Sequence, residues 1–314
     1  MKLAILCSGQ AGQHAAMLDT FLAAPDCATL RETASAVLGQ DVAAWWRGLD
    51  EAALFTNANA QFAIALYQIA TWQRLAPCLP QAPVVVAGYS LGEVIAWHVA
   101  GAIDAADTLR LVRERARFMN ACVPAAAAGA GCMALWRGRL TPAMRTARDA
   151  AFSRHGIETA IHRPGGDRVL GAPQAAMDAF MADPAVADAD LKRLPVEVPS
   201  HTRWLADAVA PFRDTLSALA PHDPAMPVLA GIDGTPQRTA RQGLDSLPRQ
   251  LAEPLHWDWC METLAALVVD IAIELGPGND LAKQLEIEIS GANARAVDEF
   301  ATPRDVSDWL ERHR

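Results

Sequence analysis

The sequence predicts an α/β protein: a large, hydrolase-like body with a parallel sheet and a nucleophile elbow, plus an inserted small ferredoxin-like α+β subdomain. Three observations support this fold class. A valine run leads into a serine between two glycines, followed by a helical pattern. The middle of the chain alternates strand and helix patterns in the order β-α-β-β-α-β. Further buried-strand and helix patterns lie before and after this unit.

The glycine-flanked serine lies at a predicted strand-to-helix turn. Val84–Val86 predicts a buried strand and Leu91–Val99 a helix, so Gly88-Tyr89-Ser90-Leu91-Gly92 has room only for a tight turn. The glycines allow a cramped backbone that leaves the Ser90 hydroxyl at the tip, and the first helical amides favour an anion there. A G-x-S-x-G match can arise by chance in a chain with 20 glycines, but the flanking strand and helix favour a nucleophile.

Composition narrows the class of protein. With 314 residues, 52% hydrophobic and 20% charged, the chain can bury a substantial core in one large domain with an insertion or in two domains. The net charge of -9 argues against non-specific nucleic-acid binding. The apolar run Met1–Cys7 is too short for a signal peptide, and no segment offers about 18 apolar residues, so we expect a cytoplasmic protein without a membrane partner.

Cysteine spacing is informative as well. The six cysteines contain no C-x-x-C pair, which favours reduced thiols over disulfides or a zinc site. We therefore expect no bound metal.

The first half of the chain offers two further segments of interest. Leu3–Cys7 predicts a buried strand, and Ser8–Gln13 is a loop of small residues that could bring backbone N–H groups close to a ligand. This loop has too few glycines for a dinucleotide fingerprint and no following lysine for a P-loop. A long helix is predicted over Asn57–Leu75, with Gln61 near its beginning.

An arginine occupies an apolar face of the next helix. Asp104 can cap a helix over Ala105–Val123. One face of this helix carries Leu111, Phe118 and Cys122. Arg115 falls on the same line, where a charged residue is out of place unless an anion meets it. A snorkelling side chain or an ion pair with a nearby acid explains Arg115 equally well at this point.

The chain then enters the predicted insert. Pro124–Gly131 is rich in alanine and glycine and predicts a hinge. The insert follows as strand Cys132–Trp136, helix Pro142–His155, strands Ile157–His162 and Arg168–Gly171, helix Pro173–Ala182 and strand Arg193–Val198. We therefore expect a large catalytic subdomain over residues 1–125 and 199–314 and a small one over 126–198. A cleft between the two is the expected ligand site.

A histidine lies where the insert ends. Pro199–Thr202 leads into a predicted helix over Arg203–Ala218, and a helix N-terminus lowers the pKa of a nearby imidazole such as His201. A histidine is usually exposed or a cap, and only its place at the domain junction distinguishes His201. The rest of the chain predicts strands Val228–Gly231 and Asp270–Leu275, a helix that follows Arg249–Pro254 and runs through Val268, a turn at Gly276–Gly278 and a helix over Asp305–Arg314.

Seven separated stretches resemble the malonyl-CoA:acyl-carrier-protein acyltransferase family. They follow one another in the family's order over nearly the whole chain. They are Ser8-Gly9-Gln10-Ala11-Gly12-Gln13, Gln61, Gly88-Tyr89-Ser90-Leu91-Gly92-Glu93, Arg115-Ala116-Arg117-Phe118-Met119, Pro199-Ser200-His201, Arg249-Gln250-Leu251 and Glu274-Leu275-Gly276-Pro277-Gly278.

Several positions depart from the family's fatty-acid-synthesis pattern. Tyr89 stands where histidine is typical, Cys7-Ser8 where Phe-Pro is typical, and His162-Arg163-Pro164 where an asparagine-containing segment is usual. Together with Leu229-Ala230-Gly231-Ile232-Asp233-Gly234, they are most similar to the epsilon subunit of bacterial malonate decarboxylase. This likeness implies that the acceptor is the decarboxylase's carrier protein, which bears a CoA-derived prosthetic arm, and that other decarboxylase subunits are possible partners.

The resemblance also implies catalytic roles. Ser90 corresponds to the nucleophile and His201 to the base that takes its proton. The backbone N–H groups of Gln10 and Leu91 correspond to the oxyanion hole. The family orients the histidine through a backbone carbonyl, which maps onto Gln250, so no third carboxylate is required.

The implied substrate is malonyl-CoA, with no permanently bound cofactor. Arg115 corresponds to the group that holds the malonyl carboxylate by two parallel hydrogen bonds, and Gln61 supports the site. The other hypotheses are an esterase or thioesterase with the same elbow, a non-catalytic subunit that holds the carrier, and an acyltransferase of fatty-acid or polyketide synthesis, which differs only in its acceptor.

Overall fold

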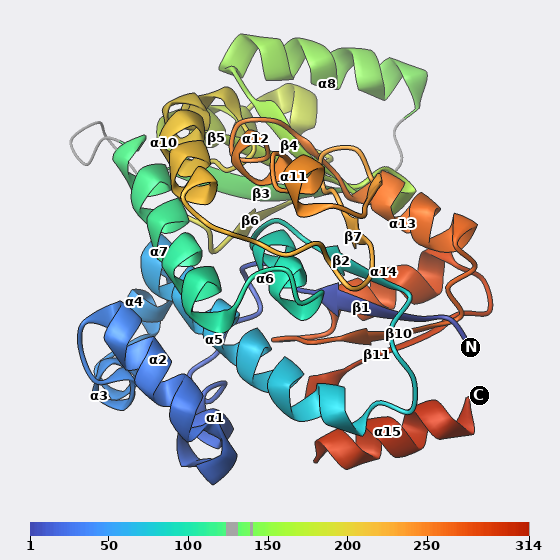
Figure 1. Ribbon diagram of the computed structural model, residues 1–314. Coiled ribbons are helices and arrows are strands. Elements are labelled where there is room, and N and C mark those ends of the chain that lie inside the picture. The colour runs from blue at the N-terminus through green and yellow to red at the C-terminus, as the bar shows by residue number, and fades with distance from the viewer. Residues whose placement is uncertain (124–130, 139–140, 314) are drawn as a thin grey trace.

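Two β-sheets organise the protein, one in the larger part of the chain and one built mainly from its middle (Figure 1). The computed structural model describes residues 1–123, 131–138 and 141–313. The first sheet has six strands in the order β11-β10-β1-β2-β7-β8, and the second has five in the order β6-β3-β5-β4-β9. The predicted α/β body with a smaller α+β unit is confirmed.

The domain boundaries themselves remain predictions. The predicted hinge, Pro124–Gly131, lies outside the described residues except for Gly131, which begins a strand. The division into residues 1–125, 126–198 and 199–314 is therefore carried forward as an expectation.

The six-stranded sheet is centred on β1 (Leu3–Cys7), which is buried along its whole length. The strands of this sheet pair in parallel, except that the short edge strand β8 pairs antiparallel with β7. The other strands are β2 (Val85–Gly88), β7 (Val228–Leu229), β8 (Pro236–Gln237), β10 (Ile271–Glu274) and β11 (Asn293–Ala296).

Helices cover both faces of this sheet, as a parallel sheet requires. On one face the hydrophobic core contains residues from α1 (Asp19–Ala23), α2 (Ala28–Leu38), α3 (Val42–Arg47), α4 (Glu51–Phe55), α5 (Asn57–Leu75), α6 (Leu91–Val99), α7 (Ala105–Ala121), α10 (Ala206–Ser217), α11 (Ala240–Gly243), α12 (Ser246–Arg249) and α15 (Pro303–Arg312). The other face packs against α13 (Trp257–Ala266) and α14 (Asp280–Glu288).

Successive side chains of β1 point to opposite faces of the sheet and so belong to different hydrophobic cores. Leu3 and Ile5 belong to the first, and Ala4 and Leu6 belong to the second. No helix in the described ranges combines the length and the apolar character needed to cross a bilayer.

The smaller sheet has the predicted ferredoxin-like order. Its strands β6, β3, β5 and β4 pair antiparallel, and a separate aromatic core of Trp136, Phe152 and Phe180 lies under its helices. Its other face packs on the body, because Leu135 and Ile161 share a core with Leu6 of β1. The elements are β3 (Gly131–Arg137), α8 (Pro142–His155), β4 (Glu158–His162), β5 (Arg168–Pro173), α9 (Gln174–Met181) and β6 (Asp190–Leu194).

A fifth strand of this sheet comes from the body and was not predicted. β9 (Leu255–His256) pairs in parallel with β4, with Leu255 opposite Ile161. The helix predicted directly after Pro254 therefore begins only at Trp257. A two-residue strand has no periodicity in sequence, and tertiary pairing alone reveals it.

Several predicted elements are shifted at one or both ends. Val84 lies outside β2 and is exposed. The last insert strand was predicted over Arg193–Val198, but the ladder ends at Leu194, where Val196 N–H donates to the Leu194 carbonyl in a turn. The helix predicted from Arg203 begins as a 3-10 turn, and α10 follows at Ala206.

The backbone of α6 lies in direct contact with β1. A methyl group built on Gly92 would lie 2.0 Å from the Cys7 carbonyl oxygen, and one on Gly88 would lie 2.2 Å from the Glu93 nitrogen. The two glycines of the elbow therefore permit a backbone approach that any side chain would prevent.

We predict that Gly92→Ala lowers the free energy of unfolding by about 3 kcal/mol or more, because both contacting groups are backbone and cannot move independently. Gly48→Ala is the matched control. Gly48 has φ -83° at a helix end and should tolerate alanine with a change below about 1 kcal/mol. Urea denaturation of both variants measures the difference, and equal stabilities would contradict the packing described above.

Candidate active site

Ser90 is held in a strained conformation between β2 and α6. Its φ of 57° and ψ of -111° are unusual for a non-glycine residue. The predicted strand-turn-helix geometry is thus present, and it places the Ser90 hydroxyl at the tip of the turn. The side chain is half-buried.

His201 reaches this hydroxyl from a segment 111 residues away. Its Nε2 lies 2.7 Å from Ser90 Oγ. Its Nδ1 contacts the Gln250 carbonyl oxygen, and its backbone N–H donates to the Leu251 carbonyl at 2.9 Å. Since a carbonyl only accepts, Nδ1 carries the proton and Nε2 presents a lone pair to Ser90, as a general base requires.

Burial keeps this imidazole neutral. The pKa of His201 is lowered to about 3, first by burial and then by the positive charge of Arg115. A lowered pKa was predicted from a helix N-terminus, but the main cause is desolvation. His201 can therefore accept a proton at neutral pH.

Arg115 lies fully buried on α7 beside the pair. Its Nη1 donates to Gln61 Oε1 at 2.7 Å, and its Nη2 lies 3.4 Å from Ser90 Oγ. Burial lowers its pKa to about 10, so it stays charged at neutral pH. Full burial excludes a snorkelling side chain, and within the described ranges no carboxylate lies at ion-pair distance. The site therefore contains a dry cation that a bound carboxylate would complement.

A chain of amides fixes the orientation of this arginine. Gln61 Nε2 donates to Asn57 Oδ1 at 2.7 Å, and Asn57 Nδ2 donates to Asn120 Oδ1 at 2.7 Å. This order leaves Gln61 Oε1 free to accept from Arg115. Sequence reasoning missed Asn57 and Asn120, although Asn57 lies one helical turn before Gln61.

The loop after β1 lies against the elbow. Cys7 pairs with Gly88, and Tyr89 N–H donates to the Cys7 carbonyl at 2.9 Å. A methyl group on Gly9 would lie 2.8 Å from the Tyr89 carbonyl oxygen. Gln10 and Leu91, the first residue of α6, therefore belong to adjacent segments. Their roles as oxyanion-hole donors remain predictions.

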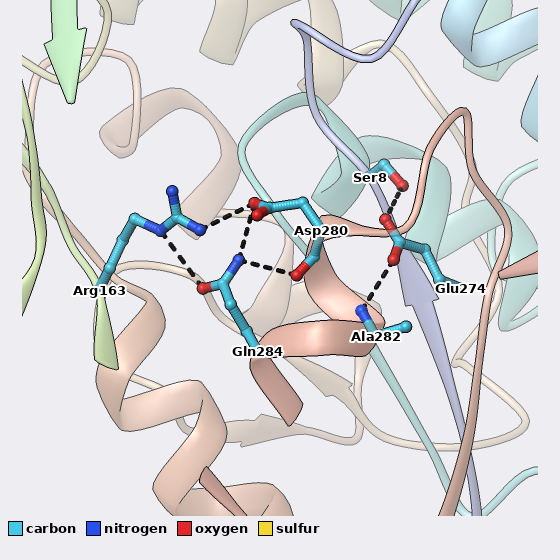
Figure 2. A network of polar contacts seen from close by, with 6 residues as sticks. All are labelled: Ser8, Arg163, Glu274, Asp280, Ala282 and Gln284. Atoms are coloured by element: carbon cyan, nitrogen blue, oxygen red, sulfur yellow. Dashed lines mark hydrogen bonds and ion pairs between the residues drawn. The ribbon is translucent and has the colours of Figure 1, made fainter. Parts of the chain in front are cut away.

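A buried carboxylate fastens this loop to the end of the sheet (Figure 2). Glu274 Oε1 accepts the Ser8 hydroxyl at 2.7 Å, and Oε2 accepts the Ala282 N–H at 2.8 Å. Gln68 adds Nε2 donation to the Ser8 and Gly276 carbonyls at 2.9 and 2.7 Å. Burial raises the pKa of Glu274 to about 7. Sequence reasoning gave Glu274 no role of its own.

Arg163, in the segment His162-Arg163-Pro164 that departs from the family pattern, joins the predicted insert to α14 of the body (Figure 2). Arg163 Nη2 lies 2.8 Å from Asp280 Oδ2, and its Nε donates to Gln284 Oε1 at 3.3 Å. Gln284 in turn donates to Asp280 Oδ2 at 2.8 Å. The second departure, Tyr89, packs edge-on against Trp257 with ring centroids 5.3 Å apart.

His162 belongs to a group of side chains that could meet a cation, together with His256 and Asp258. The two imidazole rings are stacked 4.4 Å apart and nearly parallel, at 6°, so their nitrogen lone pairs do not converge on one point. The Arg168 guanidinium also contacts His162 Nδ1. Since a positive charge already lies there, this group does not offer the geometry of a metal site.

Glu93, three residues after Ser90, is a second buried carboxyl group that sequence reasoning left without a role. Its Oε2 accepts the Gly231 N–H at 2.9 Å and Gln250 Nε2 at 3.1 Å, and its Oε1 lies 2.5 Å from Ser246 Oγ. Burial raises its pKa to about 7, although the hydrogen bonds from Ser246 and Gly231 oppose the shift.

The structure thus joins Ser90, His201, Arg115, Gln61 and Gln250 in one set of contacts. The arrangement can deprotonate a serine hydroxyl and hold an anionic group beside it.

Comparisons with known proteins agree with this arrangement. The family model described as the acyl transferase domain matches residues 5–258. A malonyl CoA-acyl carrier protein transacylase from Escherichia coli K12 is 30% identical over 305 residues, covering 95% of this chain and 96% of the relative. The crystal structure of MCAT from Mycobacterium tuberculosis superposes with a TM-score of 0.87 at 28% identity, covering 98% and 100% of the two chains.

A further similar structure contains a partner. It is a malonyl-transacylase in complex with a type II PKS acyl-carrier protein, with a TM-score of 0.88, 26% identity, and coverage of 98% of this chain and 99% of that one.

The raised pKa of Glu93 predicts a pH-dependent stability difference. Protonation stabilises the folded state, so this contribution is complete below the unfolded pKa of 4.5 and is lost as pH rises through about 7. Glu93→Gln cannot titrate, so its melting temperature relative to the unsubstituted protein should rise between pH 5 and pH 8. Thermal unfolding at both values measures this, and a difference independent of pH would contradict the assigned shift.

Proposed function

The chain belongs to the acyl transferase domain family, and we propose that it moves a malonyl group from malonyl-CoA through an ester on Ser90 to the thiol of an acyl carrier protein. Family membership confirms the resemblance to the acyltransferases, whereas the likeness to the malonate decarboxylase epsilon subunit still rests on the residues of the sequence alone. The observation that carries the malonyl assignment is the buried Arg115 guanidinium, 3.4 Å from the Ser90 hydroxyl, without an ion-pair partner among the described residues.

The first half-reaction forms the ester. His201 Nε2 takes the Ser90 proton as Oγ attacks the thioester carbonyl carbon. The backbone N–H groups of Gln10 and Leu91 stabilise the oxyanion, and each such donor is worth about 3 kcal/mol. The tetrahedral intermediate then collapses, the C–S bond breaks, and the imidazolium of His201 returns its proton to the departing CoA thiol.

The second half-reaction reverses these roles. The carrier thiol gives its proton to His201 Nε2 and attacks the ester carbonyl. The C–O bond to Ser90 breaks, and His201 protonates the released Oγ. CoA leaves before the carrier reacts, so the kinetics are ping-pong.

Arg115 accounts for selection of the acyl group. A guanidinium can hold a carboxylate by two parallel hydrogen bonds, and in a site without water this contact is strong. An acetyl group has no such carboxylate and would leave the buried cation without a counter-charge.

We predict that incubation with malonyl-CoA adds the mass of one malonyl group to the intact protein and that Ser90→Ala abolishes this adduct. Intact-protein mass spectrometry measures both. An adduct that survives in Ser90→Ala would place the nucleophile elsewhere.

Arg115→Ala should lower the ratio of kcat/KM for malonyl-CoA to kcat/KM for acetyl-CoA by roughly 100-fold or more, because a buried charge pair is lost. Arg117→Ala is the matched control, since Arg117 lies on the same helix but is exposed and pairs with Glu114. An unchanged ratio in Arg115→Ala would overturn the assignment of Arg115.

Two other classes fit less well. A serine esterase or thioesterase would pass the acyl group to water and has no use for a buried Arg115. A non-catalytic subunit that holds a carrier has no use for the Ser90 to His201 hydrogen bond of 2.7 Å.

Which carrier protein accepts the malonyl group is a separate question. The similar proteins are named for transfer to acyl carrier proteins, one of them of a type II PKS. They favour a carrier of fatty-acid or polyketide type over the decarboxylase carrier predicted from the sequence. Tyr89 and the Arg163 segment still favour the decarboxylase carrier as a second candidate. A cytoplasmic location and the absence of nucleic-acid and membrane partners remain predictions.

A direct comparison of acceptors decides between them. We expect a carrier with ordinary phosphopantetheine to show the higher kcat/KM in malonyl transfer from malonyl-CoA. The decarboxylase carrier with its CoA-derived prosthetic arm is the matched alternative. Preference for that carrier would assign the chain to the decarboxylase.

A further inference from the structure

Glu93 lies on the helix that follows Ser90 and contacts Gln250, whose carbonyl binds His201, yet the transfer mechanism does not use it. It lies on α6, whose first residue follows Ser90, and its side chain is fully buried. A buried carboxyl group is costly unless its oxygens accept hydrogen bonds. Here three groups surround it: the Gly231 N–H from the loop after β7, the Ser246 hydroxyl from α12 and the side-chain amide of Gln250, the residue after α12.

Two of these three groups belong to the segment that supports the base. Gln250 donates its side-chain amide to Glu93 Oε2 at 3.1 Å, and its backbone carbonyl accepts the Nδ1 proton of His201. Ser246 lies one turn earlier and accepts the Gln250 N–H at its carbonyl at 2.9 Å. Glu93 therefore contacts both ends of one helical turn, Ser246 and Gln250. The Gln250 carbonyl of this turn binds the imidazole of His201.

The contacts of Glu93 with Ser246 and Gln250 persist whether Glu93 is ionised or protonated. The Ser246 hydroxyl has one proton and two acceptors in reach, Glu93 Oε1 at 2.5 Å and the Gly243 carbonyl at 2.8 Å. An ionised Glu93 accepts a hydrogen bond from that hydroxyl. A protonated Glu93 donates its own proton to Ser246, which then donates to Gly243. In both cases Oε2 still accepts from Gln250.

The charged groups around Glu93 act in opposite directions. Arg115 favours the ionised form and Asp233 disfavours it, while burial is the largest effect. The carboxyl group reaches neither Ser90 nor His201 by a hydrogen bond of its own, so its influence on them passes through Gln250 and α6.

We propose that Glu93 is a positioning residue for acyl transfer: its carboxyl group ties the helix that carries Ser90 to the turn that orients His201, and so keeps Nε2 in line with Oγ. This inference rests on the proposed function, because it assigns Glu93 a part in the same reaction. It predicts an effect on the rate of ester formation rather than on binding of malonyl-CoA.

Three variants test whether the contacts of Glu93 position the catalytic groups. Glu93→Ala removes every tie and should lower kcat by about 100-fold with KM for malonyl-CoA little changed, since a displacement of about 1 Å costs that much. Glu93→Gln should keep kcat within about threefold, because its amide can donate to Ser246 and still accept from Gly231 and Gln250. Val94→Ala, the next residue on the same buried helix, should retain kcat although it creates a cavity.

Stopped-flow measurement of malonyl-Ser90 formation gives the decisive comparison. A rate in folded Glu93→Ala equal to that in Val94→Ala overturns the proposal. A loss in Glu93→Gln as large as in Glu93→Ala also contradicts it, because the charge and not the contacts would then be responsible.

If Glu93→Ala fails to fold, Gln250→Leu replaces it. This change keeps the backbone carbonyl on His201 but removes the amide bound to Glu93, and a fall in kcat of about tenfold or more with KM unchanged supports the proposal. Unchanged kcat refutes it. Failure of the unsubstituted protein to form malonyl-Ser90 would instead refute the proposed function itself.

Discussion

The backbone contact between α6 and β1 is the constraint on which the site depends. Gly92 lies so close to the Cys7 carbonyl that no side chain fits between them. This contact fixes where the elbow sits relative to the strand, and the pairing of Cys7 with Gly88 then brings the Ser8–Gln13 loop alongside Ser90. The nucleophile and the predicted oxyanion donors are therefore placed by the register of the central sheet rather than by flexible loops.

Two buried ionisable residues near this contact, Glu93 and Arg115, differ in their partners. Glu93 has hydrogen-bond donors for both of its oxygens, and the donors Ser246 and Gly231 oppose the rise in its pKa that burial causes. Arg115 has neutral amide and hydroxyl partners, and within the described part of the chain no carboxylate pairs with it. A buried cation without an ion-pair partner among the described residues favours an anionic ligand, which links the cost of burying Arg115 to the choice of substrate.

Sequence reasoning succeeded where one signal determines the structure. The periodicity of α5 and α6 predicted both helices with the bounds that the structure has. The apolar line that contains Arg115 marked this arginine as unusual but left a snorkelling or ion-paired side chain open, and only the structure shows that it is buried. It failed where long-range contacts decide. The strand β9 exists only because it pairs with β4, and Glu93 and Asn57 look like ordinary polar residues until tertiary packing buries them.

In the proposed reaction a hydroxyl, an imidazole and a guanidinium act on the same acyl group. A crystal structure of the protein after reaction with malonyl-CoA, without a carrier, tests this most directly. We expect an ester on Ser90 Oγ whose free carboxylate lies within hydrogen-bond distance of both Nη atoms of Arg115. An ester on another side chain, or a carboxylate that points into solvent away from Arg115, would contradict it.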